Sequence, residues 1–420
     1  MIRRVQVKNY RALRAIDVRL DRFHLLIGPN ASGKTTFFDA LAFVRDVVTL
    51  DLPRVFYGDA RLGLAPRCQN PRELTWNKEG GAIEIALEFE LPKDVAERSK
   101  HRAARYELQV TSEPEIAITL ETLFMIRDPL AEPRPEPREQ FPLPLTFEQP
   151  IVHQPRSPLP EGWKKVAEKT ARTDRFTSEI KRWVTPFKLG PSRSTLGGLP
   201  ADETHFPGAL SVRRTLAEQL FVLALDWHAL RRPAPPGLAP ALLPDGSNLP
   251  WAVDRLEREA PEKHAAWQDH VRTALPDVQK ISTRLREEDG SRYLEVTYAS
   301  GVTLPSWLLS DGTLRLLALS VLPYLTLPAS LVLIEEPENG LHPQAIEPVL
   351  QSLRSVYDAQ VLCASHSPVV LGLSQPADLL CFARDRSGAV DIVRGDRHPR
   401  LREWREGGDL PLLFASGILS

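Results

Sequence analysis

The sequence has few cysteines, and their spacing does not make them disulfide partners or metal ligands. Cys68, Cys363 and Cys381 are the only three, and no two of them form a C-x-x-C pair. This scarcity argues against a disulfide framework and against a zinc site. It suits a reducing compartment, so we expect the protein to work in the cytoplasm.

An excess of charge of one sign is also lacking. Lys and Arg number 53, Asp and Glu number 54, and the net charge is −1. No global field therefore favours nucleic acid or a membrane surface, although a local basic patch stays open. Arginines do gather near the C-terminus, with many acids among them, so they form either a contact surface for DNA or a solvated face. They are Arg384, Arg386, Arg394, Arg397, Arg400, Arg402 and Arg405.

We expect neither a signal peptide nor a membrane-spanning segment in this sequence. The first seven residues alternate like a strand and lack the apolar core of a signal peptide. Residues 316–334 carry no charge and are about long enough to span a bilayer. They also contain Pro323, Pro328 and several hydroxyl side chains. We therefore expect a helix, a turn and a buried strand there, and no membrane association.

Sustained heptads and internal repeats are absent too, so a long coiled coil is not expected. The 420 residues are enough for two or three domains' worth of core, and 42% of them are hydrophobic, as in ordinary globular proteins.

Alternating patterns predict strands at 81–89, 106–111 and 116–126, which could form an antiparallel sheet beside a ligand site.

The middle of the chain is rich in proline and then in helical patterns. Ten prolines between residues 128 and 160 exclude a helix or a central strand and indicate an extended connector. Helical patches are expected near 161–184, 211–230 and 251–275. After residue 278 strands and helices alternate, and the apolar runs 331–334 and 360–364 suit buried parallel strands.

The most informative motif lies at residues 28–36, which read GPNASGKTT and match G-x-x-x-x-G-K-[ST]. An apolar strand precedes it and a helical pattern follows, which is the context that a phosphate-binding P-loop requires. Its backbone N–H groups would surround the phosphates of ATP, Lys34 would reach the β- and γ-phosphates, and the Thr35 hydroxyl would bind Mg²⁺. The residues assigned to nucleotide binding are Gly28, Pro29, Asn30, Ala31, Ser32, Gly33, Lys34, Thr35 and Thr36.

Two carboxylates follow the apolar run at 331–334. A buried strand that delivers acids at its carboxyl end is the Walker B arrangement, and open α/β sheets bind their ligands at that edge. We assign Glu335 to Mg²⁺ and Glu336 to the attacking water. Alone, such a pair could be a solvated strand end. The metal-side acid is also Glu where Asp is usual, so its carboxylate lies one methylene further from the backbone.

Two further segments are weak signals alone, and their positions along the chain relative to the other motifs support a functional interpretation. Residues 310–313 (SDGT) open a helical pattern, so Ser310 and Gly312 form either an anion site or a simple N-cap. His366 follows the apolar run at 360–364 and could touch the γ-phosphate or the water, although a lone His is more often structural.

In this order, P-loop, Ser-x-Gly turn, acidic strand and His, the motifs resemble the ABC-type ATPase head. More narrowly, they resemble the RecF/SMC/OLD-like group of prokaryotic AAA-type ATPases. Residues 7–13 (VKNYRAL) are similar to that group's opening strand, and residues 334–343 (IEEPENGLHP) to its extended Walker B and D-loop. Residues 310–313 stand where ABC proteins carry Ser-Gly-Gly-Gln. The resemblance is good over about 1–50 and 300–400 and loose between them.

The resemblance implies a mechanism in which two heads sandwich two ATP molecules. Ser310 and Gly312 of one protomer would contact the γ-phosphate held by the other, so hydrolysis would need a homodimer, with Asn339 near its interface. No residue clearly matches the glutamine of the Q-loop, for which Gln69 is the candidate. No Toprim nuclease domain is visible before the end of the chain, so we expect any nuclease to be a separate polypeptide.

The sequence therefore predicts an α/β P-loop NTPase of the ABC type, with a flanking antiparallel sheet and an inserted helical lobe. We expect an ATPase that uses ATP and Mg²⁺ as a switch in DNA repair or in defence against phage or foreign DNA. The ATPase subunit of a transporter and a slow regulatory scaffold stay open as alternatives. The expected parts are the first part of the head (1–127), the connector (128–160), the helical lobe (161–277) and the second part of the head (278–420).

Overall fold

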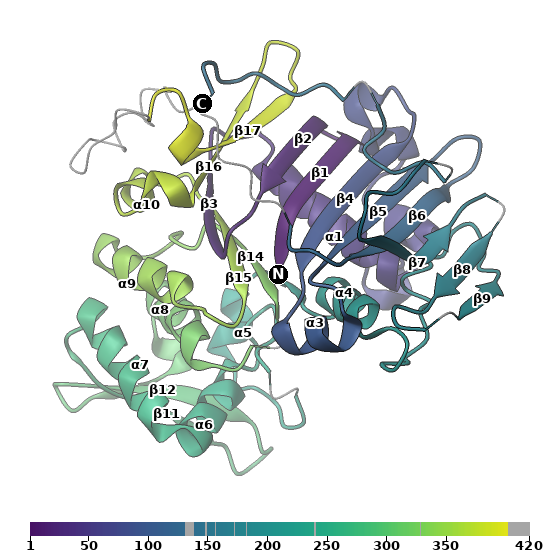
Figure 1. The fold of residues 1–420 in the computed structure, drawn as a ribbon. Coiled ribbons are helices and arrows are strands. Elements are labelled where there is room, and N and C mark those ends of the chain that lie inside the picture. Colours follow the sequence, from purple (N-terminus) through teal and green to yellow (C-terminus); the bar gives the residue numbers. More distant parts are fainter. Residues whose placement is uncertain are drawn as a thin grey trace.

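The computed structural model of the chain describes residues 1–130, 138–147, 149–155, 157–171, 173–181, 183–238, 241–327 and 329–401. Its described strands form a six-stranded core sheet, an eight-stranded antiparallel sheet and a small three-stranded sheet. Figure 1 shows the antiparallel sheet on one side of the core sheet and helices α6–α9 on the other. The expected α/β fold is confirmed.

The core sheet has the order β10-β14-β15-β3-β16-β17. All neighbours are parallel except β16 and β17, which form an antiparallel pair. The apolar runs expected at 331–334 and 360–364 are two of its inner strands. The bounds are β3 Phe23–Ile27, β10 Leu220–Leu223, β14 Leu331–Glu335, β15 Gln360–Ala364, β16 Leu379–Arg384 and β17 Val390–Arg394.

Each inner strand of this sheet supplies two separate cores. On β14, Leu331 and Leu333 pack toward the antiparallel sheet, whereas Val332 and Ile334 pack toward the helices on the opposite face. The strands β3, β15 and β16 divide their side chains in the same way. Because successive side chains of a strand point to opposite faces, a continuous apolar run is what a strand covered on both sides needs.

The antiparallel sheet has the order β2-β1-β4-β5-β6-β7-β8-β9, and helix α1 (Lys34–Thr49) packs in the core that it shares with the core sheet. The strands expected at 81–89, 106–111 and 116–126 are β4, β5 and β6. The bounds are β1 Ile2–Tyr10, β2 Leu13–Arg19, β4 Ile83–Glu90, β5 Ala103–Thr111, β6 Ala117–Ile126, β7 Trp163–Lys169, β8 Asp174–Thr177 and β9 Val184–Phe187.

The helical patch expected at 161–184 is wrong, because β7, β8 and the start of β9 occupy it. The lysines of β7 and its one glutamate suggest a helix, but the strand pairs with β6 and buries Val166 and Ala167. Cross-strand pairing and burial therefore override local propensity here. The patch at 211–230 is helical only at its two ends, because β10 interrupts it as the edge strand of the core sheet.

The remaining elements lie mainly on the helical side of the core sheet. The patch at 251–275 is confirmed as two helices, and residues 316–334 form the end of α8, a turn and β14. The bounds are α2 Leu52–Tyr57, α3 Lys93–Ser99, α4 Pro207–Ala217, α5 Trp227–Arg231, α6 Leu249–Glu259, α7 Pro261–Ala274, β11 Val278–Leu285, β12 Arg292–Tyr298, β13 Thr303–Pro305, α8 Asp311–Ser320, α9 Pro343–Arg354 and α10 Pro368–Gly372.

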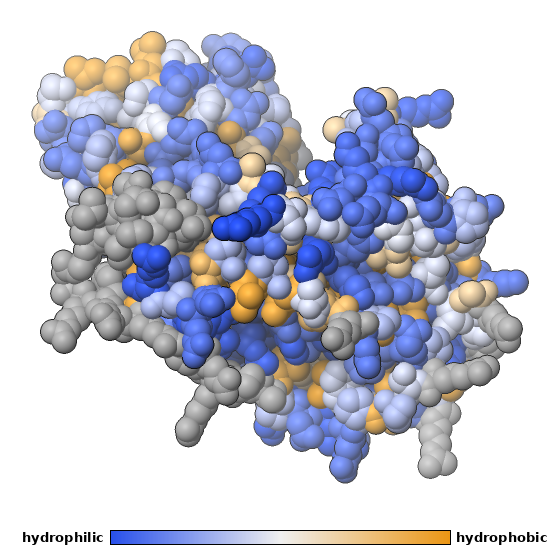
Figure 2. All heavy atoms as spheres, turned by 90° about the horizontal axis from the view of Figure 1, so that it is seen from above, coloured by the Kyte–Doolittle hydropathy of each residue, from blue (hydrophilic) through white to orange (hydrophobic). Residues whose placement is uncertain are grey.

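The connector contains no helix or strand among the residues of 128–160 that the structure describes. Within the described chain, no helix combines the length and apolar character needed to cross a bilayer. Figure 2 shows a mostly hydrophilic face on which apolar residues form separate patches. The division of the chain into four parts stays a prediction.

The packing of the core sheet leads to a stability prediction. Leu333 is fully buried between the core sheet and the antiparallel sheet. We expect Leu333→Ala to lower the free energy of unfolding by about 2–5 kcal/mol, because it removes buried methyl groups and leaves a cavity. Urea titration monitored by circular dichroism measures this change.

The matched control is Leu308→Ala, because the side chain of Leu308 is 62% exposed. It should change the free energy of unfolding by less than about 0.5 kcal/mol. Equal effects of the two substitutions would contradict the two-sided core.

Candidate functional site

The candidate site lies where three parallel strands of the core sheet end side by side. In the ladder, Glu335 of β14 is opposite Ala364 of β15, which is opposite Leu26 of β3. The segments that leave these strands are the phosphate loop after β3, Glu336 after β14 and His366 after β15. Motifs separated by more than 300 residues are therefore brought to one edge of the sheet, as expected for parallel strands.

The phosphate loop is shaped by two close approaches of backbone and side chain. Gly28 has φ 151°, and a Cβ there would lie 2.4 Å from the carbonyl oxygen of Phe382 in β16. Gly33 has φ 104°, and a Cβ there would lie 2.7 Å from Cγ2 of Val390 in β17. Both positions combine positive φ with contacts that only glycine tolerates. Strands β16 and β17 thus hold the loop in its curled form.

The start of α1 has the chemistry of an anion site. Its N-cap is Gly33, no side chain caps the first N–H groups, and its first turn holds no acid. Lys34 is 5% exposed, and its Nζ donates to the carbonyl oxygens of Gly28 and Pro29 at 2.8 and 2.9 Å. The hydroxyl-bearing Thr35 is exposed at the same turn. Uncapped N–H groups, a helix dipole and an amine together fit the phosphates of a nucleotide.

Burial also sets the protonation of this lysine. Removal from water lowers the pKa of Lys34 to about 8, and the nearby carboxylates of Glu335 and Glu336 oppose that shift. The amine therefore titrates close to neutral pH before a phosphate binds.

The two acids differ in position. Glu335 ends β14 and is exposed. Glu336 has φ 47°, its N–H donates to the carbonyl oxygen of Ala364 at 2.8 Å, and its Oε1 lies 4.0 Å from Nε2 of His366. The left-handed backbone turns its carboxylate away from the strand direction and toward the histidine. This pair is placed to hold a water between a base and a hydrogen-bonding partner.

A complete protein-only metal site is absent from the described chain, where no three His, Cys, Asp or Glu side chains gather suitably. Thr35 and Glu335 could supply only part of an octahedral set. Mg²⁺ usually takes one or two protein ligands and completes its shell with water and substrate phosphates. The residues present therefore fit Mg²⁺ that arrives together with a nucleotide.

A residue that the sequence reasoning did not assign holds this loop together. Arg315 of α8 donates from Nη2 to the carbonyl oxygen of Glu336 at 2.8 Å and from Nη1 to that of Asn339 at 2.6 Å. Its guanidinium also lies 4.7 Å from the ring centre of Trp227. Burial lowers the pKa of Arg315, and Glu338 and Glu336 counteract this. The available signal was a single cation within the apolar run 314–319 of α8.

The Ser-x-Gly turn lies at the N-terminus of α8. Ser310 Oγ accepts from the N–H of Thr313 at 3.1 Å, so it acts as the N-cap. Asp311 pairs with Arg231 at 2.7 Å, and a Cβ on Gly312 would lie 2.7 Å from the carbonyl oxygen of Gly340. Within the described chain, none of the polar contacts of this turn reaches the phosphate loop of the same protomer.

The remaining sequence candidates, a glutamine for the Q-loop and the arginines near the C-terminus, do not gather at the phosphate loop. Gln69 is exposed, and its N–H donates to Glu73 at 3.0 Å, so its assignment to the Q-loop stays a prediction. Arg394 and Arg397 line a pocket away from the phosphate loop. Arg402 and Arg405 lie outside the described residues.

These features define a P-loop NTPase whose site is built on the ends of parallel strands. A family model described as "AAA domain, putative AbiEii toxin, Type IV TA system" matches residues 23–372. The chain belongs to this family of AAA ATPases.

Among solved structures, an SMC head supports the fold. The crystal structure of an SMC head bound to the C-winged helix domain of ScpA is 12% identical with a TM-score of 0.50, covering 93% of this chain and 96% of that one. The SMC head domain from Thermotoga maritima is also 12% identical, with a TM-score of 0.44 and coverage of 94% and 98%. No curated protein matches the chain. The expected resemblance to SMC-type ATPase heads is confirmed.

The glycines lead to a binding prediction. We expect Gly28→Ala to weaken ATP binding at least about tenfold, since even 1.4 kcal/mol of strain in the loop has that effect. Gly190→Ala is the control, because a Cβ there meets no atom within 4 Å. Titration with a fluorescent ATP analogue measures both affinities, and unchanged binding by Gly28→Ala would contradict the proposed fit of the loop.

The lowered pKa of Lys34 leads to a pH prediction. Phosphate binding favours the protonated amine, so the affinity for ATP should fall as the pH rises through about 8. The phosphates themselves are already ionised there, because their second pKa is about 6. Calorimetry near pH 8 in buffers of different ionisation enthalpy should detect proton uptake on binding. A heat that is independent of the buffer would contradict the assignment.

Proposed function

We propose that this chain binds and hydrolyses ATP as a switch, and that two copies dimerise around the nucleotide. The observation that carries the proposal is the division of the catalytic parts. Lys34, Glu336 and His366 gather at one edge of the core sheet, whereas, in the part of the chain that the structure describes, the Ser310 turn makes no polar contact with the phosphate loop of its own protomer. A second protomer would complete the site.

Each residue has a proposed role at that edge. Lys34 and the N–H groups of residues 28–36 bind the phosphates, while Thr35 and Glu335 hold Mg²⁺. Glu336 orients and polarises the attacking water, and His366 contacts that water or the γ-phosphate. The 4.0 Å between Glu336 and His366 supports this pairing. Mg²⁺, when bound, neutralises charge that develops on the phosphates.

The contacts of α8 support communication between the two halves of a composite site. Ser310 and Gly312 would contact the γ-phosphate on the partner. Arg315, on the same helix, holds the carbonyl oxygens of Glu336 and Asn339. A shift of α8 on meeting the partner's ATP would therefore reach the catalytic loop of its own protomer directly.

The pathway that we propose is DNA repair or defence against phage or foreign DNA, with a separate effector such as a nuclease. The type IV toxin–antitoxin system in the family's description supports defence. The ScpA domain bound to the SMC head supports a protein partner. The three cysteines are unpaired and buried, which favours the cytoplasm as the compartment. A transporter ATPase and a slow regulatory scaffold are the competing functions.

Glu336→Gln gives the decisive test. The amide keeps the shape of the side chain but cannot act as a base, so the ATPase rate should fall at least about a hundredfold, within the range of general base catalysis. The variant should accumulate as a dimer in ATP and Mg²⁺, detected by light scattering after size exclusion. In the unmodified protein, the rate per chain should rise with protein concentration.

Glu347→Gln is the matched control, because Glu347 is an exposed acid on α9 outside the site. It should leave the rate and the oligomeric state unchanged. A monomeric Glu336→Gln variant and a rate independent of concentration would contradict the dimeric switch. Stimulation by duplex DNA would support the DNA pathway, and its absence would favour the scaffold.

A further inference from the structure

A second pocket lies at the opposite end of the strand that leads into the phosphate loop. It has a volume of about 790 Å³ and is bordered by the end of β2, the end of β4, helix α3 and the end of β17. Asp21, one of its residues, comes just before β3, whereas the phosphate loop comes just after it. None of its lining residues has a role in the proposed ATP site.

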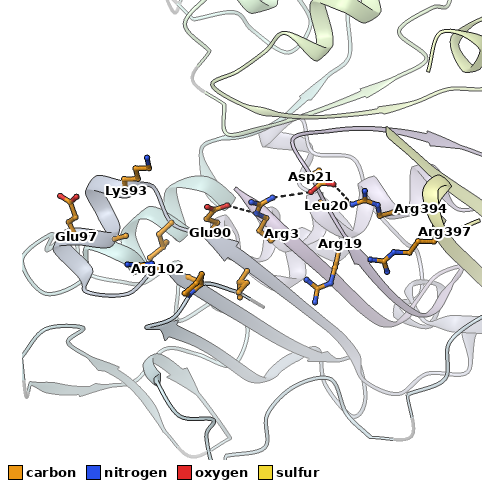
Figure 3. A pocket seen from close by; sticks show the side chains of 15 residues that line it. Arg3, Arg19, Leu20, Asp21, Glu90, Lys93, Glu97, Arg102, Arg394 and Arg397 are labelled. Carbon is orange, nitrogen blue, oxygen red and sulfur yellow. Dashed lines mark hydrogen bonds and ion pairs between the residues drawn. The ribbon is translucent and has the colours of Figure 1, made fainter. Parts of the chain in front are cut away.

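Cations outnumber acids in this pocket, as Figure 3 shows. The acids at its centre are engaged. Arg3 lies 2.8 Å from Glu90 and 3.6 Å from Asp21, and Arg394 lies 2.6 Å from Asp21. The cations that line it are Arg3, Arg19, Lys93, Arg102, Arg394 and Arg397, and the acids are Asp21, Glu90 and Glu97. A recess lined by more cationic than acidic side chains has a positive electrostatic potential, which attracts anions.

Arg397 is a partly buried cation of this pocket that lies close to other cations. Its Nε is buried and has no hydrogen-bond partner among the residues that the structure describes. Burial lowers the pKa of Arg397, and the neighbouring charge of Arg394 lowers it further, although Asp396 opposes this. A guanidinium remains protonated in proteins, so Arg397 cannot relieve the repulsion from Arg394 by losing its proton. A bound anion would offset that repulsion by forming charge-assisted hydrogen bonds.

The pocket also has an apolar floor. Leu20, Leu91 and Ala103 line it and are nearly fully buried, and Leu130 also lines it. Its volume is within the range of about 300–1,000 Å³ that is typical of small-molecule sites. A bound molecule could therefore place an anionic group near the arginines and a less polar body on the leucines.

We propose that this pocket binds a small phosphate ester of nucleotide size, with its phosphate at the end formed by Arg394 and Arg397. A nucleic-acid strand fits less well. The carboxylates of Asp21 and Glu90 interrupt the row of cations, and none of the described residues that line the pocket is an aromatic on which bases could stack.

Calorimetry on the full chain carrying Lys34→Ala tests the proposal, because this background removes the lysine of the phosphate loop. AMP should bind once per chain, and more tightly than inorganic phosphate, since the apolar floor contacts the nucleoside. Adding Arg397→Glu should weaken AMP at least about tenfold, equivalent to 1.4 kcal/mol. Adding Arg284→Glu, at an exposed site outside the pocket, should not.

Arg102→Glu is the second variant, since the exposed Arg102 can change without disturbing the fold, and circular dichroism checks both proteins. It should also weaken AMP. Three results would overturn the proposal: no AMP binding, AMP binding that neither variant weakens, or displacement of AMP by duplex DNA at lower concentrations than by inorganic phosphate. Because Lys34 is absent throughout, failure here leaves the proposed ATP switch intact.

Discussion

The register of three parallel strands is the constraint on which the rest of this structure depends. Glu335, Ala364 and Leu26 stand side by side in the ladder, so the loops that follow them begin at the same level. A slip of one residue would move Leu333 from one core to the other and shift every side chain of β14 to the wrong face. The two apolar cores therefore fix the positions of the polar groups at the strand ends.

Within that frame, Arg315 explains how a strained residue is held in place. Glu336 adopts φ 47°, a conformation that costs free energy for any residue except glycine. Glycine would relieve the strain but would remove the carboxylate. The bonds from Arg315 to the carbonyl oxygen of Glu336, and from the N–H of Glu336 to Ala364, offset that cost. The contacts of Arg315 thus explain why a positive charge lies within the apolar run 314–319 of α8.

The local sequence pattern predicted those elements whose conformation is determined by residues adjacent in the sequence. Residues 23–43 carry strand, loop and helix signals within one short segment, and the alternation at 81–89 is typical of a strand with two different faces. The prediction at 161–184 was wrong because β7 takes its conformation from β6, about forty residues earlier. Arg315 was not assigned because its partners are two carbonyl oxygens in a distant loop.

The second pocket was beyond sequence reasoning for the same reason, since β2, β4, α3 and β17 meet only in the folded chain. Its position is nevertheless informative. The five-residue strand β17 begins at Val390, whose side chain restricts Gly33 of the phosphate loop, and ends at Arg394 in the pocket. At about 3.3 Å per residue, roughly 13 Å of strand joins the two. Ligands at both ends contact one rigid element, so any influence of one on the affinity of the other must be reciprocal.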